Sequence, residues 1–437
     1  MLLERFKEHF SSDFYFIKGK SVLVATSGGV DSVVLVQLLY SLGVNIVLAH
    51  CNFQLRGENS DLDESLVRKL GEELSVETHV KSFNTSEIAE EKKLSIQIAA
   101  RNLRYNWFFE ICENHNIDFI ATAHHADDNL ETFLINLSRG SGLDGLLGIP
   151  AKNGNIIRPL LPFSKEEIIA YAKKENLAWR EDESNEETKY TRNKIRHQVI
   201  PVLKSLNPSL LKNFGNTINH LSESRNIIDE KVEEISKEII KKEGDLVKID
   251  IDKMLKLSNS KAFLYEILKD YNFTEWNNVF ELLQTQSGKI IRSKSHELLK
   301  DRGFLLLREI KLKLEGKTRY YIEEDTKEIV EPIKISLKNT DKKRTVSKNY
   351  VLVNKNLVTF PIILRKWEEG DFFYPTGMIG KKKVSKFFKD EKLSKFKKEQ
   401  TWLLCNAKNE IIWIVGMRPD RRFSIDSSTS NILQISI

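Results

Sequence analysis

Ser27-Gly28-Gly29-Val30-Asp31-Ser32 is the stretch that decides the fold. It directly follows the apolar, β-branched run 22–25 and precedes the apolar helical pattern 33–42. Two adjacent glycines allow a tight turn with successive backbone N–H groups, and the helix N-terminus adds its partial positive charge. The stretch therefore predicts a strand, an anion-binding turn and a helix, which is the opening unit of a doubly wound α/β domain.

Alternating strand and helix patterns continue to about residue 176. Apolar runs predict strands at 21–26, 45–50, 76–82 and 118–123, with helices between and after them at 32–41, 61–74, 95–114 and 127–138. Ser164 with Glu167 indicates a capping box that opens one more helix over 165–175. This order predicts a parallel sheet flanked by helices.

Ligands of such sheets collect at the carboxyl ends of the strands, so residues just after Thr26, His50 and Ala123 should line one crevice. In the turn, Ser27 and Ser32 can donate hydroxyl groups, and Asp31 can help hold Mg²⁺ against phosphates. The turn is not a Walker A loop, because it lacks the Gly-Lys-Ser/Thr ending. The alternative is a turn whose polar residues only cap the helix.

The rest of the chain has a different character. A charge-rich helical periodicity over 210–242 and a shorter mixed stretch to about 307 predict a helical middle domain. Short β-rich segments broken by Gly and Pro predict a small mixed α/β C-terminal domain. We therefore expect three domains, at 1–207, 208–310 and 311–437.

Composition narrows the class of protein. The first ten residues lack the continuous apolar run of a signal peptide, and no later run reaches membrane-spanning length, which predicts a cytoplasmic chain without a membrane partner. Cys51, Cys112 and Cys405 lie far apart in sequence, so neither disulfides nor a zinc knuckle is expected.

Positive charge is concentrated at the end of the chain. Residues 331–437 hold 22 Lys and Arg against 11 Asp and Glu, whereas residues 1–330 are net acidic. Within this region, 381–398 contains nine lysines and only Asp390 and Glu391 as acids. Such asymmetry predicts a polyanionic partner. The alternative is a lysine-rich face that only meets solvent.

An acidic helix start follows the fourth predicted strand, in the run 123–132. Asp128 and Glu131 are three residues apart and can share one helix face beside His124 or His125. Two carboxylates with an imidazole suit Mg²⁺ binding or proton removal from an ammonium group. The alternative is helix capping by Asp127 and a dipole-favoured acidic first turn.

Two further segments carry positive charge and glycine. Arg139 opens a loop with three glycines that reaches Leu146, which predicts a substrate-facing loop or a plain connection. After 181–185, the spacing of Arg192, Arg196 and His197 gives a cationic helix face suited to phosphates, or else an exposed basic helix.

The turn 27–32 resembles the signature of the PP-loop ATP pyrophosphatases. This resemblance implies that ATP is split into AMP and pyrophosphate, and that Ser27, Gly28, Gly29, Val30, Asp31 and Ser32 bind ATP together with His50. On its own it leaves amidotransferase synthetases, NAD synthetase and tRNA thiolases open.

Together the segments resemble the tRNA(Ile)-lysidine synthetase family. The matching pieces are 27–32, His50 with Asn52, 56–61, 100–105, 123–132, 139–146, 158–160, 182–201 and, near the end, 367–371, 375–377, 381–392 and 413–416. Asn129 stands where the family most often has Gln, and 210–330 shows no matching motif.

This resemblance implies a two-step reaction with ATP and Mg²⁺. The C-2 carbonyl oxygen of the wobble cytidine of tRNA(Ile) with a CAU anticodon attacks the α-phosphate, and free L-lysine then displaces AMP from that carbon. The implied catalytic residues are Asp31, which also holds Mg²⁺, Arg101, Arg104, His125, Asp128 and Glu131. The implied tRNA-binding residues are Arg139, Arg192, Arg196, Lys381, Lys382 and Lys383, and a homodimer is one candidate assembly.

Two rival functions remain at this point. A tRNA thiolase uses the same adenylation but needs cysteines to deliver sulfur, and no Cys-x-x-Cys pair is present. A non-enzymatic tRNA-binding or assembly protein would carry a degenerate nucleotide site, whereas the turn 27–32 is intact.

Overall fold

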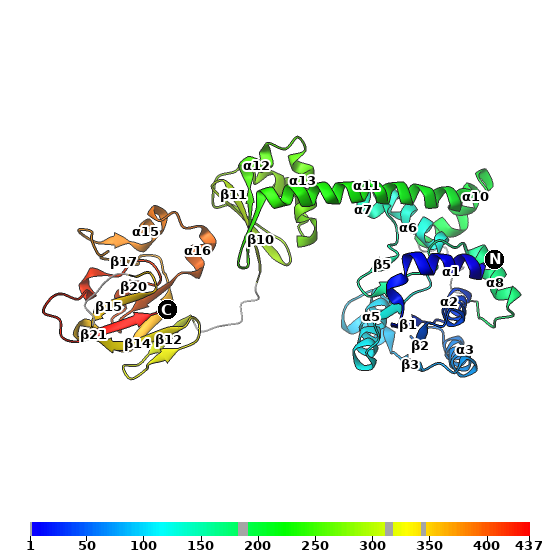
Figure 1. Cartoon of the computed structure of the whole chain (residues 1–437), viewed down its shortest axis with the longest axis horizontal. Coiled ribbons are helices and arrows are strands. Elements are labelled where there is room, and N and C mark those ends of the chain that lie inside the picture. Colours follow the sequence, from blue (N-terminus) through cyan, green and yellow to red (C-terminus); the bar gives the residue numbers. More distant parts are fainter. Residues whose placement is uncertain (1, 182–190, 311–317, 342–346) are drawn as a thin grey trace. The chain divides into compact units, whose positions relative to one another are not determined.

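The computed structural model describes residues 2–181, 191–310, 318–341 and 347–437. The chain divides into two compact units, Met1–Asp229 and Glu230–Ile437 (Figure 1). The long helix α11 (Leu210–Ile239) carries the boundary between them.

The first unit is built on a six-stranded sheet with the order β3-β2-β1-β4-β6-β5. All neighbours pair in parallel except β5 with β6. The strands are β1 (Ser21–Ala25), β2 (Asn45–Asn52), β3 (Thr78–Ser82), β4 (Phe119–Ala121), β5 (Lys152–Asn153) and β6 (Ile156–Ile157). This confirms the predicted doubly wound α/β fold.

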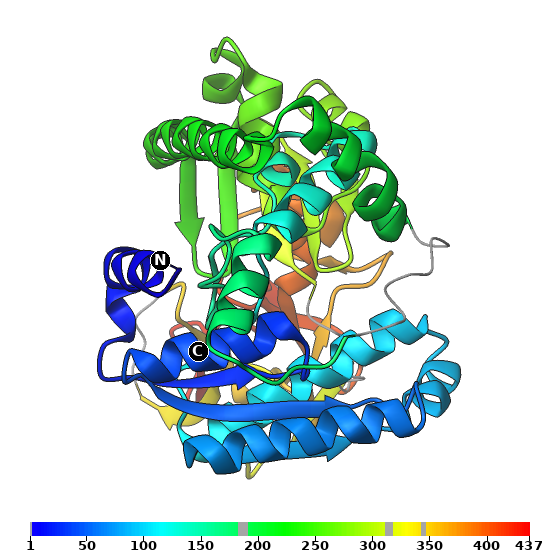
Figure 2. The same ribbon diagram turned by 90° about the vertical axis from the view of Figure 1, so that its right-hand side faces the viewer.

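Helices cover both faces of this sheet (Figure 2). The helices of this unit are α1 (Leu2–Asp13), α2 (Val30–Ser41), α3 (Glu58–Leu74), α4 (Thr85–Glu91), α5 (Ile96–His115), α6 (Ala126–Ser138), α7 (Leu143–Leu146), α8 (Lys165–Lys174), α9 (Thr191–Lys194), the π-helical turn Ile195–Val199 and α10 (Ile200–Leu206). Strand alternation separates two cores: Val22 and Val24 pack with α2 and α8, whereas Leu23 packs with α5.

The order of the strands locates the crevice. The chain runs outward from β1 through β2 to β3 and then returns to β4 on the other side of β1. The turn 27–32 follows β1, and the run that opens α6 follows β4, so both lie at the carboxyl ends of adjacent strands. Such a reversal point is where doubly wound sheets bind ligands.

The second unit begins with a mixed region. An antiparallel sheet of order β7-β8-β11-β10-β9 packs with three short helices and the end of α11 around Leu264, Leu298 and Leu305. The elements are β7 (Ile240–Glu243), β8 (Leu246–Asp250), α12 (Ile251–Leu255), α13 (Ser260–Leu268), α14 (Trp276–Glu281), β9 (Ile290–Arg292), β10 (His296–Asp301) and β11 (Phe304–Glu309). The helix predicted over 210–242 is observed as α11, which ends at Ile239, because 240–243 form β7. The following stretch, predicted as mixed, contains the rest of this antiparallel sheet and three short helices.

The C-terminal region is rich in β-structure, as predicted. It contains sheets of order β12-β16-β19-β20 and β13-β14-β21-β15, a hairpin-like pair β17-β18, and two short helices. The elements are β12 (Arg319–Ile322), β13 (Glu328–Ile329), β14 (Ile335–Thr340), β15 (Tyr350–Asn354), β16 (Ile362–Lys366), β17 (Phe372–Phe373), β18 (Lys382–Lys383), α15 (Val384–Asp390), α16 (Lys395–Gln400), β19 (Trp402–Cys405), β20 (Ile411–Ile414) and β21 (Ile432–Ser436).

Long apolar helices are absent from the described part of the chain: none has the length and hydropathy needed to cross a bilayer.

Candidate active site

The turn after β1 forms a cradle of backbone N–H groups. Ser32 Oγ accepts a hydrogen bond from the Ser27 N–H at 3.1 Å and donates one to the Gly29 carbonyl at 2.9 Å, which closes the turn on itself. Gly28 has φ +88°, and an added Cβ would lie 3.4 Å from the Asp63 carbonyl oxygen, so a larger residue would be strained there. Val30 and Ser32 are buried and anchor the start of α2.

The ends of the neighbouring strands are tied to this turn. His50, at 4% exposed, points its Nδ1 at the Thr26 carbonyl oxygen at 2.9 Å. Burial lowers the pKa of His50, which keeps the ring neutral near pH 7. Asn52 donates to Asp61 and Glu64 on α3 at 2.9 and 3.1 Å. His50 therefore ties the end of β2 to the residue that precedes the turn.

Asp31 projects from the first turn of α2 and meets a cation that the sequence reading did not assign to the site. Both of its carboxylate oxygens accept hydrogen bonds from the Lys165 ammonium, at 2.7 and 2.8 Å. Lys165 is the first residue of α8, 134 positions away in sequence. His125 Nε2 lies 3.8 Å from the same carboxylate.

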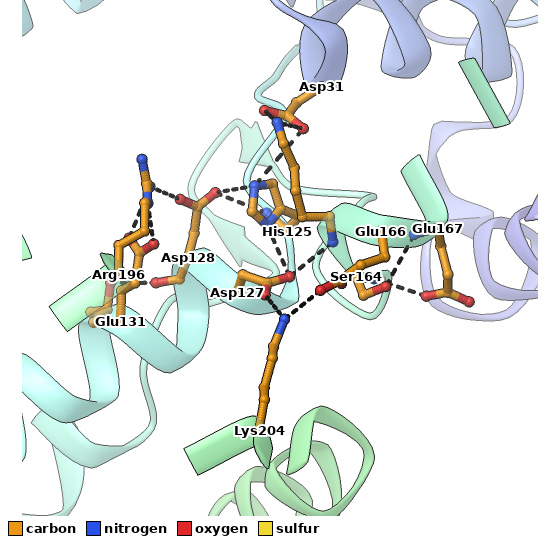
Figure 3. A network of polar contacts seen from close by, with 12 residues as sticks. Asp31, His125, Asp127, Asp128, Glu131, Ser164, Glu166, Glu167, Arg196 and Lys204 are labelled. Atoms are coloured by element: carbon orange, nitrogen blue, oxygen red, sulfur yellow. Dashed lines mark hydrogen bonds and ion pairs between the residues drawn. The ribbon is translucent and has the colours of Figure 1, made fainter. Parts of the chain in front are cut away.

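His125 joins Asp31 to the acidic start of α6 (Figure 3). Its Nε2 lies 3.4 Å from Asp128, and its backbone N–H donates to that carboxylate at 3.2 Å. Asp128 therefore caps its own helix as well as facing the crevice. Asp127 instead accepts hydrogen bonds from the Lys165 N–H and from the Lys204 ammonium, both at 2.8 Å.

Two arginines fill the acidic face of α6. Arg192 donates to Glu131 at 2.6 Å and to Asp128 at 2.9 Å, while Arg196 donates to Glu131 at 2.5 and 3.0 Å and to Asp128 at 3.3 Å. Glu131 is 1% exposed and so depends on these partners for its charge. The family resemblance implies that Asp128 and Glu131 are catalytic and that Arg192 and Arg196 bind tRNA. The structure brings these four residues together.

The charges of this cluster shift its pKa values. Burial raises the pKa of Asp128, but His125 and Arg192 outweigh burial and hold it below its usual value. Burial lowers the pKa of His124 to about 4. Burial also lowers the pKa of Arg196, yet its hydrogen bonds to Glu131 raise it overall. At neutral pH the carboxylate is ionised and His124 is neutral.

Arg101 and Arg104 occupy exposed positions on α5. Arg101 stacks over Tyr105 at 4.9 Å and Arg104 over Phe53 at 5.3 Å. The charge of Arg101 also acts on Arg158, which is buried, donates to the Pro150 carbonyl at 2.7 Å and leaves its Nε without a hydrogen-bond partner among the described residues. Arg158 is therefore a buried cation that the sequence reading had not assigned to the site.

The glycine-rich loop is held by Asn129. The side-chain oxygen of Asn129 accepts a hydrogen bond from the Ile149 N–H at 2.7 Å, and Asn136 donates to the Gly145 carbonyl at 2.8 Å. Arg139 is exposed at the end of α6. Asn129 thus shapes the loop, and residues 182–190, which include most of the predicted acidic motif, lie outside the described residues.

The three lysines of the C-terminal region differ from one another. Lys381 and Lys383 are exposed, whereas the Lys382 ammonium is 2.7 Å from Asp390 and its side chain is 16% exposed. Phe387 and Phe388 are buried beneath them in the local core, as expected for anchoring residues. The lysines belong to the second unit, and the cradle belongs to the first.

Sequence reasoning also missed Asp63, which accepts hydrogen bonds from Arg56 at 2.7 Å and from Arg180 at 2.8 Å. The Arg180 N–H donates to the Gly28 carbonyl at 3.0 Å. Arg180 and Asp63 therefore brace the cradle from outside. Their only signal in the sequence is their place beside segments that the family resemblance covers, 56–61 and 182–201.

Known protein families match most of the chain. The PP-loop domain family matches residues 2–203, the TilS substrate binding domain matches 242–310, and the TilS substrate C-terminal domain matches 362–436. The tRNA(Ile)-lysidine synthase of Parabacteroides distasonis is 40% identical over 424 residues, which are 95% of each chain. The chain belongs to the tRNA(Ile)-lysidine synthase family.

Other members cover the chain as fully. The tRNA(Ile)-lysidine synthase of Bacteroides thetaiotaomicron is 39% identical over 99% of both chains, and that of Porphyromonas gingivalis strain W83 is 35% identical over 95% of this chain and 94% of its own. Membership of the tRNA(Ile)-lysidine synthase family thus extends through the region 210–330, where no motif had been recognised.

Proposed function

We propose that the protein ligates free lysine to C-2 of the wobble cytidine of tRNA(Ile) with a CAU anticodon, using ATP and releasing AMP and pyrophosphate. The observation that carries this proposal is the family match over nearly the whole chain, and it is supported by the closed turn 27–32, whose Asp31 lies 3.8 Å from His125 at the acidic start of α6. We assign this activity to the cytoplasm, because its proposed substrate is a tRNA.

In the first step the cytidine C-2 oxygen bonds to the α-phosphorus, and pyrophosphate leaves. The Ser27 and Gly29 N–H groups donate within the turn, so the N–H groups of Gly28 and of the residues that open α2 would stabilise the leaving phosphates. Lys165 would add a positive charge, because its ammonium already lies within 2.8 Å of the cradle carboxylate Asp31. Arg101 and Arg104 on α5 would favour charge on the α-phosphate, with Arg158, whose charge interacts with that of Arg101.

Asp31 is the residue that fits Mg²⁺. Its oxygens are hard ligands in the first turn of a phosphate-binding helix, and Mg²⁺ commonly uses one or two carboxylates plus substrate phosphates. The ion would neutralise phosphate charge. The close approach of Lys165 to both oxygens supports a site that attracts cations.

In the second step the lysine ε-nitrogen bonds to C-2, AMP leaves and the ammonium proton passes to a carboxylate. Asp128 and Glu131 are the candidates, because their oxygens already hold two guanidinium groups and so accept cations. Lysine would replace Arg192 and Arg196, which we assign to tRNA phosphates with Arg139 and Lys381–Lys383. The lysine ammonium and the two guanidinium groups would bind the same carboxylate oxygens. The arginines must therefore leave these oxygens when lysine binds.

The cysteines speak against the thiolase alternative. Burial raises the pKa of Cys51 and of Cys405 to about 12, and that of Cys112 to about 11. Sulfur transfer requires a thiolate, which such thiols do not supply near pH 7.

Mass analysis of tRNA tests the proposal. The purified chain is incubated with tRNA(Ile) bearing CAU, ATP, Mg²⁺ and labelled lysine, and the nucleosides are separated. We expect lysidine, with AMP and pyrophosphate in equal amounts and no product without ATP. Folded protein that leaves the cytidine unmodified would overturn the assignment.

Two further proposals concern the assembly and the domains. Sedimentation of the same sample tests the homodimer. Limited proteolysis tests the domain boundaries at 207 and 310.

A further inference from the structure

A cluster of metal-ligand side chains lies at the opposite end of the sheet from the cradle. Glu77 precedes β3 and His79 is its second residue, while His115 is the last residue of α5. The amino end of a parallel strand and the carboxyl end of its crossover helix meet at the edge away from the nucleotide crevice. None of these three residues takes part in the proposed reaction.

The donor atoms are close together. His79 Nε2 lies 3.0 Å and His115 Nδ1 lies 3.4 Å from the same Glu77 oxygen, and one ligand atom from each residue falls within 4.8 Å of the others. The two imidazoles meet edge to face with centroids 4.6 Å apart. Ligands at about 2.1 Å from a tetrahedral zinc ion lie roughly 3.4 Å from each other, which is near these separations.

His79 Nε2 also lacks the partner that a buried nitrogen needs. The atom is shielded from solvent, and despite its 3.0 Å approach to Glu77 it has no hydrogen-bond partner among the described residues. Lys81 does not compensate Glu77, because its ammonium turns toward Glu110 at 3.6 Å and over the rings of Phe83 and Trp107. A cation between the three donors would satisfy both the nitrogen and the carboxylate.

We propose that Glu77, His79 and His115 form a binding site for a divalent transition metal, with zinc as the best fit. Two imidazoles and one carboxylate suit zinc, cobalt or nickel, whereas Mg²⁺ prefers oxygen ligands alone. Glu77 and His115 are partly exposed, at 55% and 42%, so water can complete the coordination and the ion can enter from solvent. The site would fasten the end of α5 to the start of β3, independently of lysidine formation.

Cobalt spectroscopy and zinc calorimetry test this site on the full chain. The titrations contain no nucleotide, because ATP binds metals. Excess Mg²⁺ is added so that it occupies the sites made of oxygen ligands. We expect the double variant His79→Gln with His115→Gln to bind one equivalent less Co²⁺ and Zn²⁺ than the unmodified protein. The visible absorption of Co²⁺ bound to imidazole should fall with it. Zinc should also raise the melting temperature of the unmodified protein more than that of the variant.

His220→Gln is the matched control, because it removes an exposed histidine from α11 and should change nothing. Glu77→Gln removes one ligand from an exposed position and serves if the double variant does not fold. Equal metal stoichiometry in the unmodified protein and the variants would overturn the proposal, and so would a protein that binds no Zn²⁺ at all. Lysidine formation should be the same in the variants, so this test is separate from that of the proposed function.

Discussion

Asp31 binds the Lys165 ammonium through both carboxylate oxygens, and the proposed reaction assigns Mg²⁺ to the same carboxylate. We expect Asp31→Ala to lower AMP formation by about two to three orders of magnitude, as removal of one preorganised charge does in other active sites. Binding of tRNA should stay nearly unchanged, because the carboxylate acts on phosphate charge in the cradle. Release of AMP and filter binding of tRNA measure the two effects separately.

Asp118→Asn is a suitable control for this change. Asp118 pairs with Lys20 at 3.0 Å and accepts a hydrogen bond from the Ser21 N–H at the amino end of β1, away from the cradle. Its loss removes a paired carboxylate from the same sheet without touching phosphates. If Asp31→Ala formed AMP as fast as the Asp118→Asn control, Asp31 would not be a catalytic residue.

The acidic pair on α6 leads to a second prediction at this scale. Asp128→Asn and Glu131→Gln should impair the use of lysine more than the use of ATP, because a neutral amide neither pairs with an ammonium nor accepts its proton. The KM for lysine should rise and the second step should slow, while pyrophosphate release in the first step persists. Single-turnover assays that follow pyrophosphate and lysidine separately check this split.

Each substitution also weakens the bonds to Arg192 and Arg196. A melting temperature close to that of the unmodified protein is therefore the control for folding. If saturating lysine restored normal turnover in both variants, the lysine site would have to lie elsewhere. The same would follow if pyrophosphate release fell as far as lysidine formation.

Among the elements, the loop that follows α6 depends on one close approach. Gly148 has φ +69°, and an added Cβ would lie 2.0 Å from the Asn129 side-chain oxygen that accepts the Ile149 N–H. Gly154 has φ +58° with no atom within 4 Å of such a Cβ. Both alanine variants bear the cost of a positive φ, but only Gly148→Ala also breaks the contact.

We therefore expect Gly148→Ala to lower the free energy of unfolding by up to roughly 1–3 kcal/mol more than Gly154→Ala, because the partly buried Ile149 N–H would lose its acceptor. Urea denaturation of the two variants, followed by the fluorescence of the chain, gives this difference. If both variants lost the same free energy of unfolding, the loop would be able to move away from Asn129 at no energetic cost.

Regular elements with strong local patterns could be predicted from the sequence. The apolar runs at 21–26 and 45–50 became β1 and β2, and Ser164 caps α8 as the Ser164–Glu167 spacing indicated. Strands of two residues, such as β5 and β6, are too short to leave a period-2 pattern. The sheet of 240–309 was missed for another reason: short helices divide its strands into two groups along the chain, and the strands carry many charges.

Contacts within the candidate site were only partly predictable. The strand order brings Asp31 and His125 to one crevice, as the rule for doubly wound sheets requires. The pairing of Glu131 with Arg196 spans 65 positions, and that of Asp31 with Lys165 spans 134. Sequence shows that these residues are charged but not which opposite charge each one meets, because the tertiary packing decides this.

On the scale of the whole molecule, chemistry and positive charge lie in different units. The cradle is in Met1–Asp229, and the lysine-rich segment 381–398 is in Glu230–Ile437. That segment is firmly anchored: Phe396 packs against Leu299 and Leu306, and Arg308 lies 3.7 Å from the centre of its ring. A rigid base with exposed lysines suits attraction of a polyanion better than catalysis.

Binding of tRNA at several salt concentrations measures what these lysines do. Each phosphate contact steepens the log-log salt dependence by roughly 0.7–0.9, so changing Lys381, Lys382 and Lys383 to Ala should flatten it by up to about two to three units if all three contact phosphates. Because Lys382 is held by Asp390, we expect most of the change from Lys381→Ala with Lys383→Ala alone. Lys338→Ala with Lys408→Ala removes the same charge from exposed positions elsewhere in the unit and should leave the slope nearly unchanged. Affinity for ATP should stay constant, because its site is in the first unit. An unchanged slope in the triple variant would mean that these lysines only meet solvent.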